Sequence, residues 1–295
     1  MSGSGRETQE VAVAGAKRAD VRDDRVLPYT RGLSLFIVPF LVAAFVILYL
    51  FPEHTPRLWA WTIQATMTSM VLASAYLGGA YFFLRVVRER HWHEVATGFL
   101  AVTAFASLLG IATLLHWGIF AHDHVSFWLW AGLYFTAPFL VIGAWLANRR
   151  YGAPVAEGDV LLRPVERALI TAVGVLALAT GVVMFLAPGS VIPLWPWPLT
   201  PLSCRVVGAT LCLGGAGAGV WFDPRWTSVR LMLQVEVLML ALMVVAAVRA
   251  RDEMIASHAL TWPLLLGTLA VLAGSAYLWA SYERGPRRAA VRPGL

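Results

Sequence analysis

Residues 58–80 read LWAWTIQATMTSMVLASAYLGGA, and residues 194–216 read LWPWPLTPLSCRVVGATLCLGGA. These two stretches decide the predicted fold. At an offset of 136 without gaps they share nine identical positions in 23. Each belongs to an apolar run long enough for a membrane-crossing helix. We therefore expect a chain built from two copies of one helical unit.

The similarity extends on both sides of these stretches. The aligned pairs are Arg31 with Arg167 and Pro52 with Pro188 at the same offset and, at an offset of 134, Trp92 with Trp226, His124 with His258, Trp128 with Trp262, Trp145 with Trp279 and Arg150 with Arg284. Each copy is predicted to hold four spans, an even number, so both enter the membrane in the same direction. Such repeats are related by a pseudo-two-fold axis along the membrane normal, and ligand sites commonly lie between them. The alternative is a duplication that only enlarged a packing unit.

The composition is that of an integral membrane protein. The 295 residues are 59% hydrophobic and 14% charged, with a mean hydropathy of +0.68. A soluble chain would have about a quarter of charged residues. Too few polar residues remain for a disordered chain, a disulfide-stapled secreted domain or a large catalytic domain on one anchor. No lysine lies in a predicted span, which excludes retinal bound as a Schiff base.

Apolar runs bounded by charge, Pro or Trp predict eight transmembrane helices. The spans are 33–51, 58–84, 95–117, 127–147, 168–186, 202–222, 229–248 and 261–282. The predicted organisation is a disordered cytoplasmic tail at 1–30, a first four-helix repeat at 31–150, a cytoplasmic linker at 151–166, a second four-helix repeat at 167–284 and a basic cytoplasmic tail at 285–295. No signal peptide is expected, because the first apolar region begins after residue 30 and is as long as a full span.

Basic residues are distributed unequally between the two sides of these spans. Nineteen of the 23 Lys and Arg residues fall in the tails and in the second, fourth and sixth connections, whereas the other side holds only Arg57, Arg205, Arg249 and Arg251. The positive-inside rule places both termini in the cytoplasm. We interpret the positive charge as orientation charge, so nucleic acid is not an expected partner. Arginine outnumbers lysine 22 to 1 and the chain is rich in Ala, Gly and Val, which indicates a high-GC bacterial source. For a helical bundle of eight spans from such a source we expect an inner-membrane location.

The 13 tryptophans fit the same depth assignment, because Trp prefers the headgroup level. We expect them to be interfacial anchors rather than ligand contacts. Those at outer ends are Trp59, Trp61, Trp117, Trp128, Trp130, Trp195, Trp197 and Trp262, and those at inner ends are Trp92, Trp145, Trp221, Trp226 and Trp279.

Small residues gather in the second and sixth spans, and close helix contacts in lipid need small residues. The helix-packing candidates are Ala75, Gly78, Gly79, Gly214, Gly215 and Gly219. Our hypothesis is that these two helices line the interface between the repeats. Pro196 and Pro198 cannot both lie inside a regular helix, so the sixth span is expected to begin after an irregular outer segment.

Three polar side chains are predicted at membrane depth: Gln234, Glu236 and Arg205. Glu236 is the one carboxylate well inside a span, where a charge is costly and usually functional or paired. It is interpreted either as a proton, cation or ligand site, or as a protonated group that bonds to a neighbouring helix. Arg205 lies near the outer edge, where its side chain can reach the headgroups. A depth difference of roughly 16 Å speaks against a pair between Arg205 and Glu236.

The histidines give weaker signals. His122 and His124 lie on the same side of an extended strand but on different sides of a helix, so metal or haem binding would need an irregular loop. The pairing of His124 with His258 argues equally for a hydrogen bond repeated in both copies. His91 and His93 are interpreted as part of a solvated connection. No phosphate-binding loop, zinc motif or nucleophile elbow is present, so no catalytic residues are assigned and any cofactor is unknown.

The segment LWPWPLTPL at 194–202 resembles a pattern in uncharacterised multi-span integral membrane proteins of high-GC, actinobacterial-type bacteria. The resemblance covers about 30 residues and implies no activity. The first functional hypothesis is binding or permeation of a small or apolar molecule between the repeats, with Glu236 as the polar contact. The alternatives are a structural or accessory subunit that binds another membrane protein, and a haem-binding redox protein.

Overall fold

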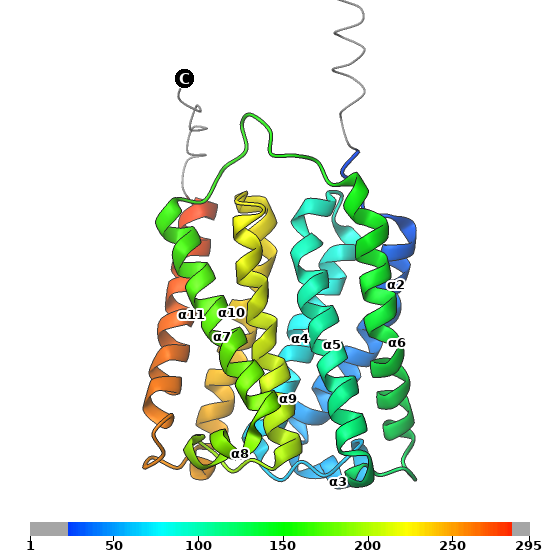
Figure 1. The fold of residues 1–295 in the computed structure, drawn as a ribbon, viewed down its shortest axis with the longest axis vertical. Coiled ribbons are helices and arrows are strands. Elements are labelled where there is room, and N and C mark those ends of the chain that lie inside the picture. Colours follow the sequence, from blue (N-terminus) through cyan, green and yellow to red (C-terminus); the bar gives the residue numbers. More distant parts are fainter. Residues whose placement is uncertain (1–22, 285–295) are drawn as a thin grey trace, which may run out of the picture.

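Eight helices in residues 23–284, the part of the chain that the computed structural model describes, are long and apolar enough to span a membrane (Figure 1). They are Pro28–Leu50, Thr66–Arg88, Ala96–Leu115, Val125–Tyr151, Pro164–Leu186, Pro201–Trp221, Trp226–Arg249 and Thr261–Arg284. The prediction of an all-helical, multi-pass membrane protein with eight spans is confirmed. The predicted tails lie outside the described residues, apart from residues 23–30.

Several spans continue into short pieces of different helical geometry. The long elements are α2 (Pro28–Phe45) with η1 (Val46–Leu50), α4 (Thr66–Arg88), α5 (Ala96–Leu115), α6 (Val125–Asn148) with η5 (Arg149–Tyr151), α7 (Pro164–Leu186), α9 (Pro201–Cys212) with η7 (Leu213–Trp221), α10 (Trp226–Arg249) and α11 (Thr261–Arg284). The short elements between them are η2 (Pro52–His54), α3 (Thr55–Leu58), η3 (Trp92–Glu94), η4 (Trp117–Ile119), α8 (Pro188–Val191), η6 (Ile192–Leu194) and η8 (Arg251–Glu253).

Proline marks the start of several spans. Pro28, Pro164 and Pro201 occupy the first position of α2, α7 and α9. The missing N–H of proline costs nothing there, because the first N–H groups of a helix have no partner within it. At α9 the side chain of Thr200 adds a cap by accepting a hydrogen bond from the backbone N–H of Ser203 at 3.1 Å.

The first unit (residues 24–151) and the second unit (residues 160–284) pair their helices in the same order. In the first unit α2 packs against α4 and α5 against α6, and in the second unit α7 packs against α9 and η7 and α10 against α11. Between the units, α4 packs against α10, and α5 packs against α9 and η7. Each unit is therefore two helix pairs that are joined mainly through the other unit.

The two ends of the bundle differ. We call the end at which α2 begins and α11 ends the terminal end, and the opposite end the distal end. In Figure 1 the terminal end is at the top, together with the long connection between α6 and α7. Residues 23–30, which the sequence analysis placed in a tail, form ordered structure here: α2 begins at Pro28, and the backbone N–H of Asp24 donates to the carbonyl of Tyr151 at 2.8 Å.

The second span begins later than predicted. The span was expected to begin at residue 58, but α3 ends at Leu58, residues 59–65 are irregular and α4 starts at Thr66. The carbonyl of Ala60 accepts a hydrogen bond from the N–H of Ala121 at 2.9 Å. The carboxylate of Glu253 in the second unit caps α4 by accepting the N–H groups of Thr66 and Met67 at 2.7 and 2.9 Å. These long-range partners for the backbone, which local sequence does not reveal, replace the helical hydrogen bonds.

The tryptophans are not all interfacial anchors. Seven of the 13 are buried: Trp59, Trp61, Trp92, Trp130, Trp195, Trp197 and Trp226. For these seven the predicted anchor role is wrong, because their rings pack inside the protein. The ring centroids of Trp61 and Trp130 are 4.9 Å apart, and those of Trp195 and Trp197 are 5.2 Å apart. Large aromatic surfaces thus close the distal end from within.

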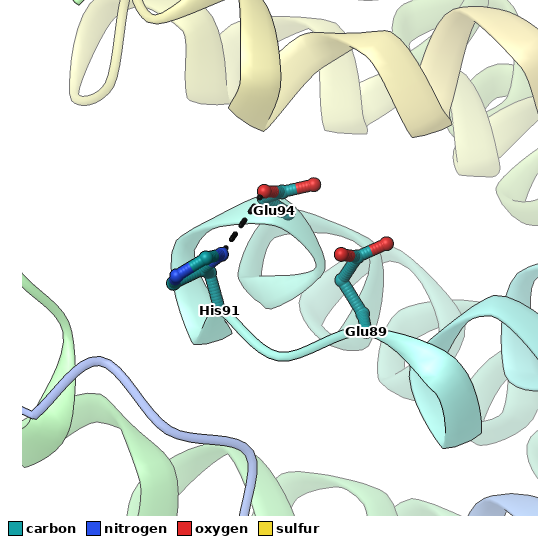
Figure 2. A group of neighbouring side chains, drawn as sticks. All are labelled: Glu89, His91 and Glu94. Atoms are coloured by element: carbon teal, nitrogen blue, oxygen red, sulfur yellow. Dashed lines mark ion pairs between the residues drawn. The ribbon is translucent and has the colours of Figure 1, made fainter.

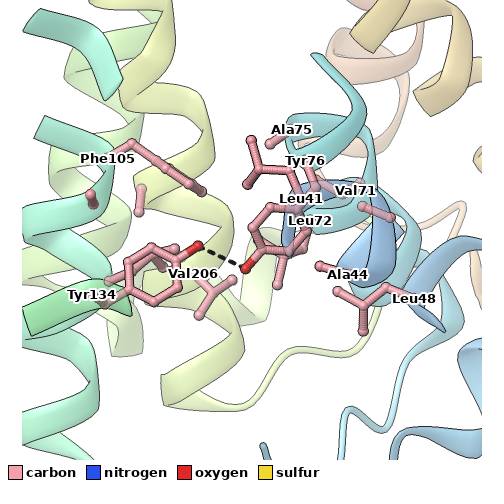
Figure 3. Close-up of a cluster of buried hydrophobic side chains, with 14 of the residues drawn as sticks. Leu41, Ala44, Leu48, Val71, Leu72, Ala75, Tyr76, Phe105, Tyr134 and Val206 are labelled. Carbon is pink, nitrogen blue, oxygen red and sulfur yellow. Dashed lines mark hydrogen bonds between the residues drawn. The ribbon is translucent and has the colours of Figure 1, made fainter. Parts of the chain in front are cut away.

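A buried tyrosine pair lies at mid-length of the first unit's helices (Figure 3). The hydroxyl of Tyr134 on α6 donates to that of Tyr76 on α4 at 2.9 Å. Phe105 from α5 and Val206 from α9 lie beside this bond, so helices of both units enclose it. Each hydroxyl is satisfied by the other, which avoids the cost of a buried unpaired polar group.

Candidate functional site at the terminal end

Glu236 and Gln234 lie on α10 but bond in different directions. The hydroxyl of Ser275 on α11 donates to Oε2 of Glu236 at 2.9 Å. The side-chain oxygen of Gln234 accepts from the hydroxyl of Tyr81 at 2.8 Å and from Arg85 at 3.1 Å, both on α4. Gln234 therefore contributes to the contact between the units, whereas Glu236 bonds within the second unit.

Arg205 has partners inside the protein. Its Nε donates to the carbonyl of Phe185 at 3.1 Å, and its Nη1 lies 2.7 Å from Nε2 of His116. Guanidinium has no acceptor atom, so this nitrogen of His116 must be the unprotonated acceptor. Burial, followed by the positive charge of Arg205, lowers the pKa of His116. The pair joins the two units near the distal end.

Some small residues of the second and sixth spans lie in contacts between the units, and others lie in contacts within one unit. A Cβ at Gly78 would come 2.7 Å from Cγ of Met239 on α10, and one at Gly219 would come 2.5 Å from Thr97 in α5. A Cβ at Gly214 would meet Ala177 on α7 at 2.7 Å, within the second unit. The other candidates also face inward: Gly79 toward Leu41, Gly215 toward Leu178, with Ala75 buried.

The three histidines His122, His124 and His258 at the distal end contact different residues. Nδ1 of His124 lies 3.5 Å from the carbonyl of Trp59, and Nδ1 of His258 lies 2.5 Å from the carbonyl of Trp195. His122 packs its ring against Phe127, with centroids 4.6 Å apart. His124 and His258 thus make the equivalent hydrogen bond in the two units, which the sequence analysis gave as one alternative.

A small cavity lies at the terminal end, between loops of both units. Its volume is about 240 Å³. The lining residues are Trp92, His93 and Ala96 from the first unit, 152–155 from the connection, and Phe222, Asp223 and Arg225 from the second unit. Aromatic and aliphatic side chains share the wall with charged ones, so a molecule bound there would meet both apolar surface and charge.

A chain of three polar side chains adjoins this cavity. Nδ1 of His93 hydrogen-bonds to Oδ2 of Asp24, and Nε2 of His93 lies 3.0 Å from Oγ1 of Thr227. Asp24 precedes α2, His93 lies in η3, and Thr227 lies in the first turn of α10. Burial alone would raise the pKa of Asp24, but bonds to His93 and to the backbone of Ala153 outweigh it and hold the pKa below its usual value. This arrangement fixes the ring of His93 at the cavity wall.

The charged pair that the second unit contributes to the lining, Asp223 and Arg225, is fully engaged. Nε and Nη2 of Arg225 donate to the carboxylate of Asp223 at 2.8 and 2.6 Å, and Nη2 also lies 3.2 Å from the carbonyl of Ala153. The bonds from Arg225 and Ser228 overcome the effect of burial and lower the pKa of Asp223. Arg225 therefore holds the connection between the units against the second unit.

No family model, curated protein or solved structure matches this chain.

A second group of titratable side chains, drawn in Figure 2, lies between α4 and α5 at the same end of the bundle. In the described part of the chain, Glu89, His91 and Glu94 are the one group of three His, Cys, Asp or Glu residues whose donor atoms all lie within 4.8 Å of one another. Nδ1 of His91 is 3.4 Å from Oε1 of Glu94. Glu89 pairs with Arg85, and Glu94 pairs with Arg230 of α10, each at 3.2 Å. Burial, and next the charge of Glu89, raise the pKa of Glu94 above its usual value.

The residues at the terminal end were not predicted as a site. Asp24 was assigned to a tail, and His91 and His93 to a solvated connection. Asp24 and Thr227 are far apart in the sequence, and no motif joins them. One signal was present: the alignment of the two copies pairs 91–93 with 225–227, which places both loops at equivalent positions next to the junction of the units.

Proposed function

We propose that the chain consists of two parallel four-helix repeats related by a pseudo-two-fold axis along the membrane normal. Equivalent backbone contacts support this. An isolated antiparallel bridge joins Arg25 to His91, and another joins Leu161 to Arg225, at offsets of 136 and 134. The N–H of Trp92 donates to the carbonyl of Asp24 at 2.7 Å, and that of Trp226 to the carbonyl of Val160 at 2.8 Å.

Side-chain bonds between the first and last helix of each unit agree with the same proposal. Nδ2 of Asn148 on α6 donates to Oγ1 of Thr30 on α2. At the aligned positions of the second unit, the hydroxyl of Tyr282 on α11 donates to Glu166 on α7 at 2.5 Å. The residue types differ, but the position of the bond is the same. Contacts that persist while residue types change support descent from one duplicated unit.

The proposed orientation has both termini in the cytoplasm and the protein in a bacterial inner membrane. The charge asymmetry of the sequence supports it. Reporter fusions at residue 295 and in the distal connection 251–260 test the orientation. A cytoplasmic reporter should be active at residue 295 and inactive in the distal connection, and the reverse pattern would overturn it.

The function that the geometry supports best is binding of a small molecule in the terminal-end cavity between the units. The observation that carries this proposal is that the first unit, the connection and the second unit all contribute to its wall. A ligand there would contact both units at once. Trp92 and Val155 offer apolar surface, and His93 offers a ring whose orientation is fixed by Asp24 and Thr227. A small, partly aromatic molecule with one polar group fits this lining.

Ligand-induced stabilisation of the purified full chain tests the proposal. Indole, benzoate and benzylamine are suitable probes because they have similar rings and differ in charge. A ligand that binds only the folded state, at a hundred times its Kd, stabilises by about 2.7 kcal/mol. At least one probe should raise the unfolding temperature of the wild type, and Ala96→Trp, which fills the cavity, should reduce the effect.

Ala259→Trp is the matched control, because Ala259 is exposed at the distal end. It should respond to the probes as the wild type does. The proposal is overturned if all three probes leave the unfolding temperature of the wild type unchanged. It is also overturned if the probes raise the unfolding temperature of Ala96→Trp as much as that of the wild type.

A second candidate function, an accessory subunit, is favoured by the exposure of α11. Thr261 and Ser275 are the only buried residues of this helix, and added Cβ atoms at Gly267 and Gly274 would meet nothing within 4 Å. Small residues on an open helix face permit close approach of another transmembrane helix. Purification in mild detergent should then yield a stoichiometric partner that Gly274→Leu removes. A monomer without a partner would rule against this function.

A further inference from the structure

We propose that Glu89, His91 and Glu94 form a binding site for one divalent transition-metal ion, with Zn²⁺ as the best-suited ion. The site is separate from the terminal-end cavity, because none of the three residues lines that cavity. The proposal is therefore independent of the proposed function. The three side chains converge from one short segment between α4 and α5, as Figure 2 shows.

The spacing of the donor atoms fits a small ion. Donors on a tetrahedral zinc ion with bonds of about 2.1 Å lie roughly 3.4 Å apart. Nδ1 of His91 and Oε1 of Glu94 are 3.4 Å apart. All three donors lie within 4.8 Å of one another, close to the separation that a shared zinc ion requires.

The ion pairs with arginine use one oxygen of each carboxylate. Nη2 of Arg85 contacts Oε2 of Glu89, and Nη2 of Arg230 contacts Oε2 of Glu94. Both pairs can persist while a cation binds Oε1 of each carboxylate. The arginines then orient the ligands from outside, the role that hydrogen-bonding partners of metal ligands commonly play. Because Arg230 belongs to α10, this arrangement connects the metal site to the second unit.

The donor set selects the class of ion. One imidazole nitrogen and two carboxylate oxygens suit Zn²⁺ or Mn²⁺, whereas Mg²⁺ and Ca²⁺ favour oxygen ligands alone. Three protein ligands leave a fourth position for water or a bound molecule. Glu94 is 9% exposed, so a bound ion would also relieve the repulsion between two partly buried carboxylates.

Zinc binding to the purified full chain tests the site. Isothermal titration with ZnCl₂ should give one ion per chain, with MgCl₂ binding far more weakly. His91→Ala should weaken Zn²⁺ binding at least tenfold. The side chain of His91 is 55% exposed, so this substitution is expected to leave the fold intact. Co²⁺ bound in place of Zn²⁺ should give a visible absorption band that His91→Ala abolishes.

Controls separate this site from other metal-binding groups. Glu53→Gln with His54→Ala removes an exposed neighbouring Glu and His at the distal end and should leave Zn²⁺ affinity unchanged. Glu94→Gln should weaken binding as His91→Ala does, and circular dichroism establishes whether that variant folds. The proposal is overturned if the wild type binds no Zn²⁺, or if His91→Ala binds it as tightly as the wild type.

Discussion

The first and second units pair their helices in the same order, but the last helix of the first unit, α6, is more deeply buried than the last helix of the second unit, α11. In α6 the buried residues include Phe127, Trp130 and Tyr134, which join the aromatic and tyrosine clusters of the first unit. In α11 the buried residues are Thr261 and Ser275 alone. The same backbone arrangement thus supports a helix packed into the core and a helix that faces outward. Topology and burial are separate properties, and the second does not follow from the first.

The largest expected effects concern two aligned tryptophans, Trp61 and Trp197, which are 2% and 1% exposed. Substitution of either by Ala should lower the free energy of unfolding by about 3–5 kcal/mol. The phenylalanine variants should differ, because Nε1 of Trp197 donates to Thr68 at 2.9 Å. Loss of that bond leaves a buried hydroxyl unpaired, so Trp197→Phe should cost about 1–3 kcal/mol more than Trp61→Phe.

Reversible unfolding in detergent measures both differences. If the two phenylalanine variants lower the free energy of unfolding equally, the hydrogen bond between Trp197 and Thr68 does not stabilise the protein.

The next effect concerns Gly181 on α7, where the second unit packs backbone against backbone. A Cβ at Gly181 would come 2.4 Å from the carbonyl oxygen of Gly208. Gly181→Leu should therefore force α7 and α9 apart and cost about 1–3 kcal/mol. Gly267→Leu on the open face of α11 is the control and should change stability by less than about 0.5 kcal/mol. Comparable costs in the two variants would contradict the close α7–α9 contact.

A smaller effect is expected at Glu236 and Ser275, where the first unit has Val102 and Val141 at the aligned positions. Ser275→Val should cost about 0.6 kcal/mol, the average for a hydrogen bond between membrane helices. The double variant Glu236→Val with Ser275→Val should recover that loss, because replacing both polar partners removes the unpaired group. A double variant less stable than Ser275→Val would assign Glu236 a role beyond this bond.

The smallest effect is a pH dependence at His116, whose aligned residue in the second unit is Ala250. The folded pKa of His116 is lowered, so the unfolded chain binds a proton more readily. The contribution of neutral His116 to the stability of the folded protein is complete above the unfolded pKa of about 6.5. This contribution is lost as the pH falls through the lower pKa of the folded state. Unfolding temperatures between pH 8 and 5 should fall more steeply for the wild type than for His116→Gln. His54→Gln should behave as the wild type, and identical slopes for all three would contradict the Arg205–His116 link.

Much of the fold could be predicted because hydropathy and charge report directly on a lipid environment. Eight spans follow from long apolar runs. The start of α4 could not be predicted in this way, since part of the segment 59–65 satisfies its backbone through partners far away in the sequence, such as Ala121 for the carbonyl of Ala60. The burial of Trp61 and Trp197 was hidden for a similar reason: an indole at the end of a helix has the same sequence signature whether it faces lipid or protein.

The candidate site was harder to predict than the fold. Sequence reasoning favours an intramembrane carboxylate such as Glu236, because a charge in lipid is conspicuous. Asp24, His93 and Glu94 lie in polar connections, where charged residues are common and carry no signal. The packing of α10 against η3 brings Thr227 to His93 and Arg230 to Glu94. Such convergence depends on three-dimensional contacts that a single sequence does not reveal.

The most direct test of the central claim, that the two units interlock through α5 and η7, is a disulfide between them. A Cβ at Gly219 would lie 3.5 Å from Cβ of Thr97, within the range of disulfide geometry. In a background with Cys204→Ser and Cys212→Ser, the pair Thr97→Cys with Gly219→Cys should form an oxidative cross-link that keeps the units together after protease cleavage within residues 152–160. Thr97→Cys with Gly267→Cys should separate into two fragments. Separation of the Thr97→Cys, Gly219→Cys chain into two fragments under the same conditions would contradict the interlocked arrangement.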